Sequence, residues 1–156
     1  SLLRDEETTF RGTYYQVESA VCGPKPVNPD LPIWVGGRGK ERTPRIAARF
    51  ADGFNMPYLS PEAVADRLER LEAACDTERR DFSEMQSSVN VGFYMGDRAP
   101  EVDPNGCLTG SAQQVVDRIG AYVDSGVQGL NIALRPPVDW EALARFIDDV
   151  MPHFES

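Results

Sequence analysis

Short apolar runs alternate with stretches of helical periodicity along most of the chain, starting at Pro32. Residues 33–35 are continuously apolar and rich in β-formers, which predicts a strand buried on both faces in a parallel sheet. The next stretch has Ile46 and Phe50 four residues apart, which predicts a helix. The same alternation then repeats three times. The predicted strands are residues 33–35, 53–56, 89–95 and 130–134, and the predicted helices are residues 43–50 and those that begin after Ser60, Ser111 and Asp139.

Capping residues support these helix boundaries. Ser60 is a good N-cap with Pro61 at the first helical position, and Ser111 and Asp139 precede the last two helices. Gly126 stands where a left-handed residue commonly ends a helix. We therefore expect each helix to bury one apolar stripe. The expected stripes are Val64, Leu68, Leu71 and Cys75 in the second helix, Val115, Ile119, Tyr122 and Val123 in the third, and Leu143, Phe146, Ile147 and Val150 in the fourth.

Four β-then-α units in sequence predict an α/β fold with a parallel sheet and right-handed crossovers. A TIM barrel contains eight such units, so residues 32–156 are expected to form half of a (β/α)8 barrel. An open, doubly wound sheet fits the same pattern. A half-barrel has two open sheet edges, here at the strands of Trp34 and Leu130, and we expect its inner face to be apolar.

Residues 1–31 lack this periodicity and are expected to form an irregular lead-in segment. Within it, residues 10–17 predict a short extended piece or a hairpin. Pro24, Pro26 and Pro29 then enforce an extended linker, because each proline also restricts the residue before it. A further stretch rich in Pro, Asp and Gly predicts a loop over residues 96–110.

Composition and charge exclude several classes of function. The net charge of −9, with Arg and Lys interleaved among Asp and Glu, argues against nucleic acid as a partner. No apolar run approaches the roughly 20 residues of a membrane span, so we expect no membrane partner. Three separated cysteines and a single histidine offer no metal cluster. Unpaired thiols and an N-terminus without a signal-peptide core predict a cytoplasmic protein.

One glycine-rich turn between a strand and a helix has the residues for phosphate binding. Glycines let the backbone turn sharply and approach a ligand, and the following helix N-terminus offers free N–H groups. Lys40 and Arg42 add positive charge, but the spacing matches neither a Walker A loop nor GxGxxG. A solvated turn is an equal alternative on these residues alone. The candidate phosphate-binding residues are Gly36, Gly37, Arg38 and Gly39.

Other polar residues give weaker signals. Asp52 precedes a strand and is typical of a turn. Asn55 and Met56 stand at the C-terminal end of a strand, where barrel active sites lie, and either could touch a cofactor ring or serve packing. Arg135 follows the fourth strand and could reach the barrel mouth, whereas His153, after the last helix, is typical of a surface residue. No nucleophile–base pair is visible, so the catalytic residues stay unknown.

Several segments together resemble the luciferase-like monooxygenase superfamily. They are residues 32–39 (PIWVGGRG), 45–55 (RIAARFADGFN) and 108–127, the last from Leu-Thr-Gly-Ser to Ser-Gly-Val. Residues 10–15 and 24–27 are similar to the segment that precedes this strand in the family. The resemblance covers nearly the whole chain and points most closely to oxidoreductases that use the deazaflavin coenzyme F420.

The resemblance implies the C-terminal half of a barrel that binds FMN or F420 at its mouth, for hydride transfer or monooxygenation. It places the cofactor phosphate on Gly36, Gly37, Arg38 and Gly39. The family's usual catalytic residues belong to the other half, so the isolated chain is expected to be inactive. The alternative is a non-catalytic half-barrel that binds a flavin or only assembles. The implied partners are the cofactor, a small organic substrate, and either a second copy or the N-terminal half.

Overall fold

The computed structural model describes residues 1–96 and 103–154, and its chain divides into two compact units, Ser1–Pro32 and Ile33–Ser156. In the first unit, β1 (Thr8–Arg11) and β2 (Gln16–Ala20) form an antiparallel hairpin. The backbone N–H of Gly12 donates to the carbonyl of Tyr15 at 2.9 Å and closes its turn. Of the two forms expected for residues 10–17, the structure therefore has the hairpin.

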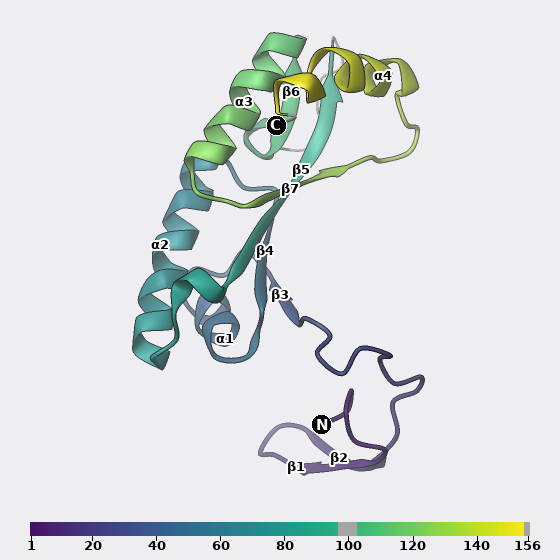
Figure 1. The fold of residues 1–156 in the computed structure, drawn as a ribbon, viewed down its shortest axis with the longest axis vertical. Coiled ribbons are helices and arrows are strands. Elements are labelled where there is room, and N and C mark those ends of the chain that lie inside the picture. Colours follow the sequence, from purple (N-terminus) through teal and green to yellow (C-terminus); the bar gives the residue numbers. More distant parts are fainter. Residues whose placement is uncertain (97–102, 155–156) are drawn as a thin grey trace. The chain divides into compact units, whose positions relative to one another are not determined.

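The second unit is a parallel sheet of five strands with four α-helices (Figure 1). β3 pairs with β4, β4 with β5, and β5 with both β6 and β7. Every pairing is parallel, as the repeated βα units predict. In chain order, the elements are β3 (Trp34–Gly36), α1 (Arg42–Phe50), β4 (Gly53–Pro57), α2 (Pro61–Glu78), β5 (Gln86–Met95), β6 (Cys107–Gly110), α3 (Ala112–Asp124), β7 (Gly129–Ala133) and α4 (Trp140–Asp149).

The long strand β5 explains how the sheet holds both β6 and β7. Its residue Gly92 pairs with Cys107 of β6 and with Ala133 of β7, so these two strands lie on opposite edges of β5. Asn90 pairs with the last residue of β4, and β6 continues along the same edge from Gly92. Residues 96–110 were expected to be a loop. That expectation is wrong for β6, and residues 97–102 lie outside the described part of the chain.

The starts of α2, α3 and α4 are those that the sequence predicts, whereas α1 begins at Arg42, one residue before the predicted start. The Ser60 side chain accepts a hydrogen bond from the N–H of Ala63, and Asp139 accepts one from the N–H of Ala142. Ser111 begins α3 with a full capping box, in which its side chain and that of Gln114 satisfy each other's backbone N–H groups. Gly126 has a φ of +86°, the left-handed conformation expected after a helix.

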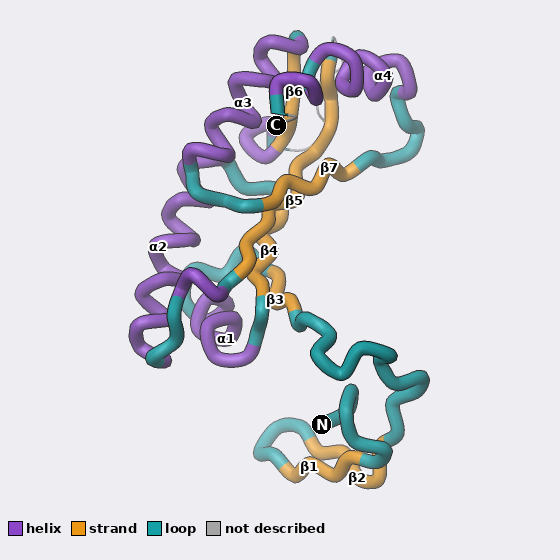
Figure 2. The backbone as a smooth tube through the Cα atoms, in the orientation of Figure 1, coloured by secondary structure: helices purple, strands orange, loops and turns teal. Residues whose placement is uncertain are grey.

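The core lies between the sheet and the helices; α1, α2 and α3 run along one side of the strands, and α4 lies near the end of β5 (Figure 2). Phe54, Met56, Val89, Val91 and Leu108 point from the strands into this core and are fully buried. Burying each such side chain stabilises the fold by about 1.5–3 kcal/mol relative to exposure. The side chains that meet them from the helices include Ala47, Val64, Leu71, Val115, Tyr122, Phe146 and Val150.

Three helices turn a somewhat different face to the core than their apolar spacing predicts. Phe50 of α1 is 63% exposed and Val123 of α3 is 59% exposed. In α4 the buried side chains are Ala142 and Phe146, while Ile147 is 50% exposed. Ala142, Phe146 and Val150 are spaced four residues apart and together form the buried face. The small Ala142 therefore faces the core, while the larger Ile147 faces solvent.

The middle of the sheet face that points away from the helices is polar, which corrects the expected apolar inner face there, while Trp34 of β3 keeps its edge apolar. Side chains alternate between the two faces of a strand, and paired residues of parallel strands point to the same side. Val89 and Val91 face the helices, so Ser88 and Asn90 occupy the opposite face. Asn55 pairs with Ser88, and Asn131 pairs with Asn90, on that same face.

Candidate functional site

The glycine turn between β3 and α1 is packed closely on the first turn of the helix. The N–H of Gly37 donates to the carbonyl of Asn55 at 3.1 Å and ties the turn to the end of β4. A Cβ atom added to Gly39 would lie 2.3 Å from Thr43 Oγ1, and one added to Gly37 would lie 3.2 Å from Thr43 Cγ2. Glycines at positions 37 and 39 therefore let the turn pack closely against Thr43 of α1.

The N-terminus of α1 has the features of an anion site. Its N-cap residue, Glu41, makes no side-chain hydrogen bond to the helix, and the first turn contains no acidic residue. The first N–H groups of a helix have no intrahelical partner, and the helix dipole adds positive charge at this end. Lys40 is exposed beside them. This donor set suits a phosphate.

Arg38 belongs to the turn in sequence, but its side chain reaches another strand. Its Nη2 donates to the carbonyl oxygen of Tyr58 at 3.3 Å, just beyond the end of β4. The guanidinium is therefore held toward the C-terminal edge of the sheet. The geometry keeps Gly36, Gly37 and Gly39 together as a backbone cradle and gives Arg38 a different neighbour.

Of the remaining candidate residues from the sequence, only Asn55 lies on the open face of the sheet. Asp52 serves the fold, because its Oδ2 accepts a hydrogen bond from the N–H of Ile33 at 2.8 Å. Met56 is fully buried on the helix-facing side, so it does not reach the sheet's open face. Asn55 does lie on that face, half-buried. His153 is exposed in a short 3-10 helix near the chain end.

Sequence reasoning missed a ladder of amides across three strands. Asn55 Nδ2 donates to Ser88 Oγ at 2.9 Å and to Asn90 Oδ1 at 3.1 Å. Asn131 Nδ2 donates to the same Asn90 oxygen at 3.1 Å. The signal was the alternation Ser88-Val89-Asn90-Val91, in which every second residue is polar. A hollow of about 870 Å³ opens beside this ladder, with Asn55, Ser88 and Asn131 among its lining residues.

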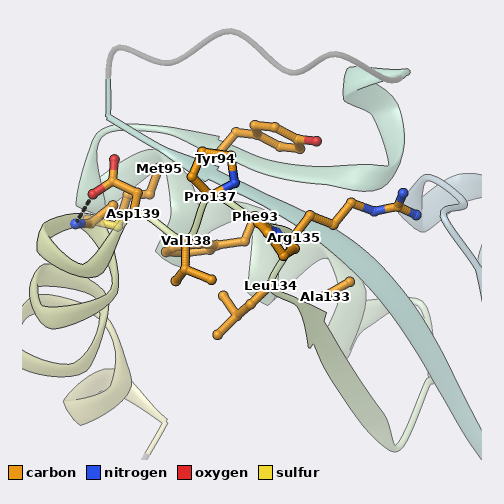
Figure 3. Close-up of a pocket in the computed structure, with 11 residues that line it drawn as sticks. Phe93, Tyr94, Met95, Ala133, Leu134, Arg135, Pro137, Val138 and Asp139 are labelled. Atoms are coloured by element: carbon orange, nitrogen blue, oxygen red, sulfur yellow. Dashed lines mark hydrogen bonds between the residues drawn. The ribbon is translucent and has the colours of Figure 1, made fainter.

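A smaller cavity lies at the C-terminal ends of β5 and β7. Its volume is about 310 Å³, and Phe93, Leu134 and Val138 form part of its wall (Figure 3). The size matches the lower end of small-molecule pockets. Figure 3 shows Arg135 extending from this group, away from Asp139 at the start of α4. The C-terminal edge of the sheet therefore contains a cavity, and Arg135 lies at its border.

The described residues offer no obvious catalytic pair. Burial raises the pKa of the Cys75 and Cys107 thiols and of the Tyr122 hydroxyl above their ordinary values. A raised pKa keeps these groups protonated at neutral pH and makes them poor nucleophiles or bases. Within residues 1–96 and 103–154, no three His, Cys, Asp or Glu side chains gather as a metal site. None of the helices in those ranges has the length and apolar character needed to cross a membrane.

Comparison with solved structures shows where this fold occurs. A coenzyme F420-dependent tetrahydromethanopterin reductase from Methanopyrus kandleri superposes with a TM-score of 0.78 at 16% identity, over 99% of this chain and 60% of that chain. An F420-dependent secondary alcohol dehydrogenase, solved with an F420-acetone adduct, gives 0.78 at 15% identity, over 99% and 58%.

A third neighbour is the oxygenating constituent of a Pseudomonas putida Baeyer–Villiger monooxygenase, solved with FMN. Its TM-score is 0.58 at 14% identity, over 97% of this chain and 59% of that chain. The chain thus spans about three fifths of the length of these proteins. The neighbours are TIM-barrel enzymes, so the parallel sheet is part of a (β/α)8 barrel, as the half-barrel prediction states.

Sequence comparisons identify the family directly. No curated protein sequence matches the chain. The sequence model of the luciferase-like monooxygenases does match, over residues 1–106, which is more than half of the chain. The chain belongs to the luciferase-like monooxygenase family.

Proposed function

We propose that this chain supplies the cofactor-phosphate cradle of an F420- or FMN-dependent oxidoreductase. The observation that carries the proposal is the glycine turn packed on an uncapped helix N-terminus, where a side chain at position 39 would press on Thr43 in the first turn of the helix. The backbone of Gly36, Gly37 and Gly39 would hold the phosphate. Arg38 would add positive charge from the neighbouring end of β4. The names of two neighbours record F420 dependence, and a third was solved with FMN.

The bound cofactor would supply hydride transfer or oxygen activation, and the chain's own residues bind and orient it. The 310 Å³ cavity at the C-terminal ends of β5 and β7 would receive part of the ring or of a small organic substrate. Phe93 and Val138 form an apolar part of the cavity wall, and Arg135 and Asp139 form a polar part. Active sites of TIM barrels lie at this edge of the sheet.

The alternative is a non-catalytic half-barrel that binds a flavin or only assembles. The observation that favours it is the lack of a visible acid–base pair among the described residues. Under either proposal the isolated chain performs no turnover.

We further propose that residues 1–31 act as a lead-in segment to a half-barrel over 32–156. Three free cysteines suit a cytoplasmic location.

Cofactor titration tests the proposal. FMN and F420 are titrated separately against the full-length protein, and at least one is expected to bind. Gly37→Val should weaken that binding, because the new side chain would press on Thr43. Gly120→Ala is the matched control, since its Cβ meets no atom within 4 Å. If neither cofactor binds, or if Gly37→Val binds as tightly as the parent, the turn is not the phosphate site.

A further inference from the structure

Tyr58 occupies an unusual backbone position at the C-terminal end of β4. Its φ of +52° is left-handed, a conformation that non-glycine residues adopt rarely. Its N–H donates to the carbonyl of Asn90 at 2.7 Å, and Gly106 lies directly behind it. A Cβ on Gly106 would lie 2.6 Å from the backbone carbonyl of Tyr58. The surrounding structure therefore fixes Tyr58 in place, as is common at binding sites.

Two arginines from opposite sides of the sheet meet at this tyrosine. Arg38, after β3, donates to the Tyr58 carbonyl at 3.3 Å. Arg135, after β7, donates through Nη2 to the Tyr58 hydroxyl at 3.0 Å, and its guanidinium carbon lies 5.4 Å from the ring centre. Two positive charges repel each other unless an opposite charge lies between them. In this acidic chain, neither Arg38 nor Arg135 forms an ion pair with a described carboxylate.

These side chains enclose a small cavity. Its volume is about 140 Å³, and it is lined by Arg38, Tyr58, Asp103 and Arg135. Drug-sized ligands occupy roughly 300 Å³ or more, so this space suits a single small group. Asp103 uses one carboxylate oxygen to accept the N–H of Asn105 at 3.0 Å. The lining charges sum to one positive charge, which matches one anionic group.

We propose that Arg38, Tyr58 and Arg135 form a pocket for one oxyanion, a carboxylate or a phosphate group, distinct from the backbone N–H groups of the glycine turn. A guanidinium has five N–H donors, and among the described residues the hydrogen bond to Tyr58 uses one of them in each arginine. Arginine's planar donor fork matches the paired oxygens of such groups. The oxyanion belongs either to the bound cofactor or to the substrate. The pocket does not depend on the proposed cofactor function, because its three side chains are placed without it.

Side-chain NMR of the arginines tests the pocket in the full-length protein. The Nε–Hε signals of Arg38 and Arg135, assigned from Arg38→Gln and Arg135→Gln, are followed during titration with inorganic phosphate and with acetate. Both signals are expected to move and saturate together, while the signal of exposed Arg79 stays constant. Arg135→Gln should weaken the response of Arg38 about tenfold. Arg135→Lys should recover only part of it, because lysine lacks the fork.

Two further titrations identify the source of the oxyanion. If Arg135→Gln weakens FMN or F420 binding about tenfold, the group belongs to the cofactor. If cofactor affinity is unchanged and phosphate still moves the arginine signals of the loaded protein, the group belongs to the substrate. Arg135 lies outside the glycine turn, so a weakened Arg38 response in Arg135→Gln separates this pocket from the backbone N–H groups of the turn. Arginine signals that do not move, or that move equally with Arg79, would overturn the proposal.

Discussion

Replacing Gly39 with alanine tests the cradle through a single methyl group. The added Cβ would lie 2.3 Å from Thr43 Oγ1 and 3.3 Å from Thr43 Cβ. Non-bonded heavy atoms prefer separations of about 3.5–4.0 Å, so Thr43 must rotate or the turn and the helix must move apart by up to about 1 Å. Rotation of the Thr43 side chain can point its Cβ hydrogen at position 39, but the 3.3 Å contact with Thr43 Cβ would remain. The backbone of the turn is therefore expected to shift away from the ligand.

The size of the effect follows from the hydrogen bonds at stake. A hydrogen bond to a charged group contributes about 1.5–3 kcal/mol. A 1 Å shift breaks or misaligns at least one N–H bond to the phosphate, since such bonds weaken steeply with geometry. Losing one bond of this kind weakens binding by about 10- to 100-fold. Gly39→Ala should therefore raise the cofactor Kd by that factor and leave overall folding intact.

Calorimetric titration of the full-length protein with the bound cofactor measures this change. Thr43→Ala and the double variant Gly39→Ala/Thr43→Ala complete a mutant cycle, which isolates the steric term between the two positions. We expect the double variant to bind more tightly than the sum of the two single changes predicts. Additive effects would refute the steric reasoning, and unchanged affinity in Gly39→Ala would remove the turn from the site.

Two further predictions concern buried polar groups. Tyr122→Phe should lower the free energy of unfolding by about 1–3 kcal/mol, because the hydroxyl donates to the buried carbonyl of Leu59 at 2.7 Å. Burial raises the pKa of Tyr122, so ionising its hydroxyl costs more free energy in the folded state than in the unfolded state. The free energy of unfolding should therefore be constant below a pH of about 10 and fall as the pH rises above it. Tyr122→Phe should reduce that alkaline loss in urea titrations. Burial also raises the pKa of Cys107, so dithionitrobenzoate at pH 8 should label Cys22 much faster; equal rates would contradict this.

Local signals in the sequence were sufficient for the repeated βα units. Short apolar runs, capping residues and helical stripes each depend on neighbours within a few positions. The strand β6 was missed because it has only four residues and follows a Pro-, Asp- and Gly-rich stretch. Its pairing with the far end of β5 decides its conformation. Tertiary contacts of this kind override local composition.

For the same reason, the sequence predicted only part of the candidate site. The glycine turn is contiguous, so its residues could be recognised together. The polar inner face was visible as alternation at Ser88 and Asn90, yet the barrel expectation favoured an apolar interior. The meeting of Arg38 and Arg135 at Tyr58 depends on β5 bringing the ends of β3 and β4 on one edge near the end of β7 on the other, and no local pattern encodes it.

Exposed apolar side chains gather on the elements at the two ends of the sheet. In the described residues, β3 pairs only with β4, and β7 pairs only with β5, so each has an open edge. Phe50 on α1, which follows β3, is 63% exposed, and Trp140 on α4, which follows β7, is 71% exposed. Open edges and uncovered apolar groups both favour association.

The isolated 156-residue chain is therefore expected to associate. At low micromolar concentration, light scattering should give a mass above 17.3 kDa, from a second copy of the chain. The variant Phe50→Glu/Trp140→Lys should lower that mass, because charges placed at both ends oppose contact with another copy. Adding the N-terminal half of the barrel should also suppress self-association, since it would cover the same surfaces. A parent chain that stays at 17.3 kDa and melts cooperatively would show that the uncovered ends are stable as they are, and the half-barrel would need no partner.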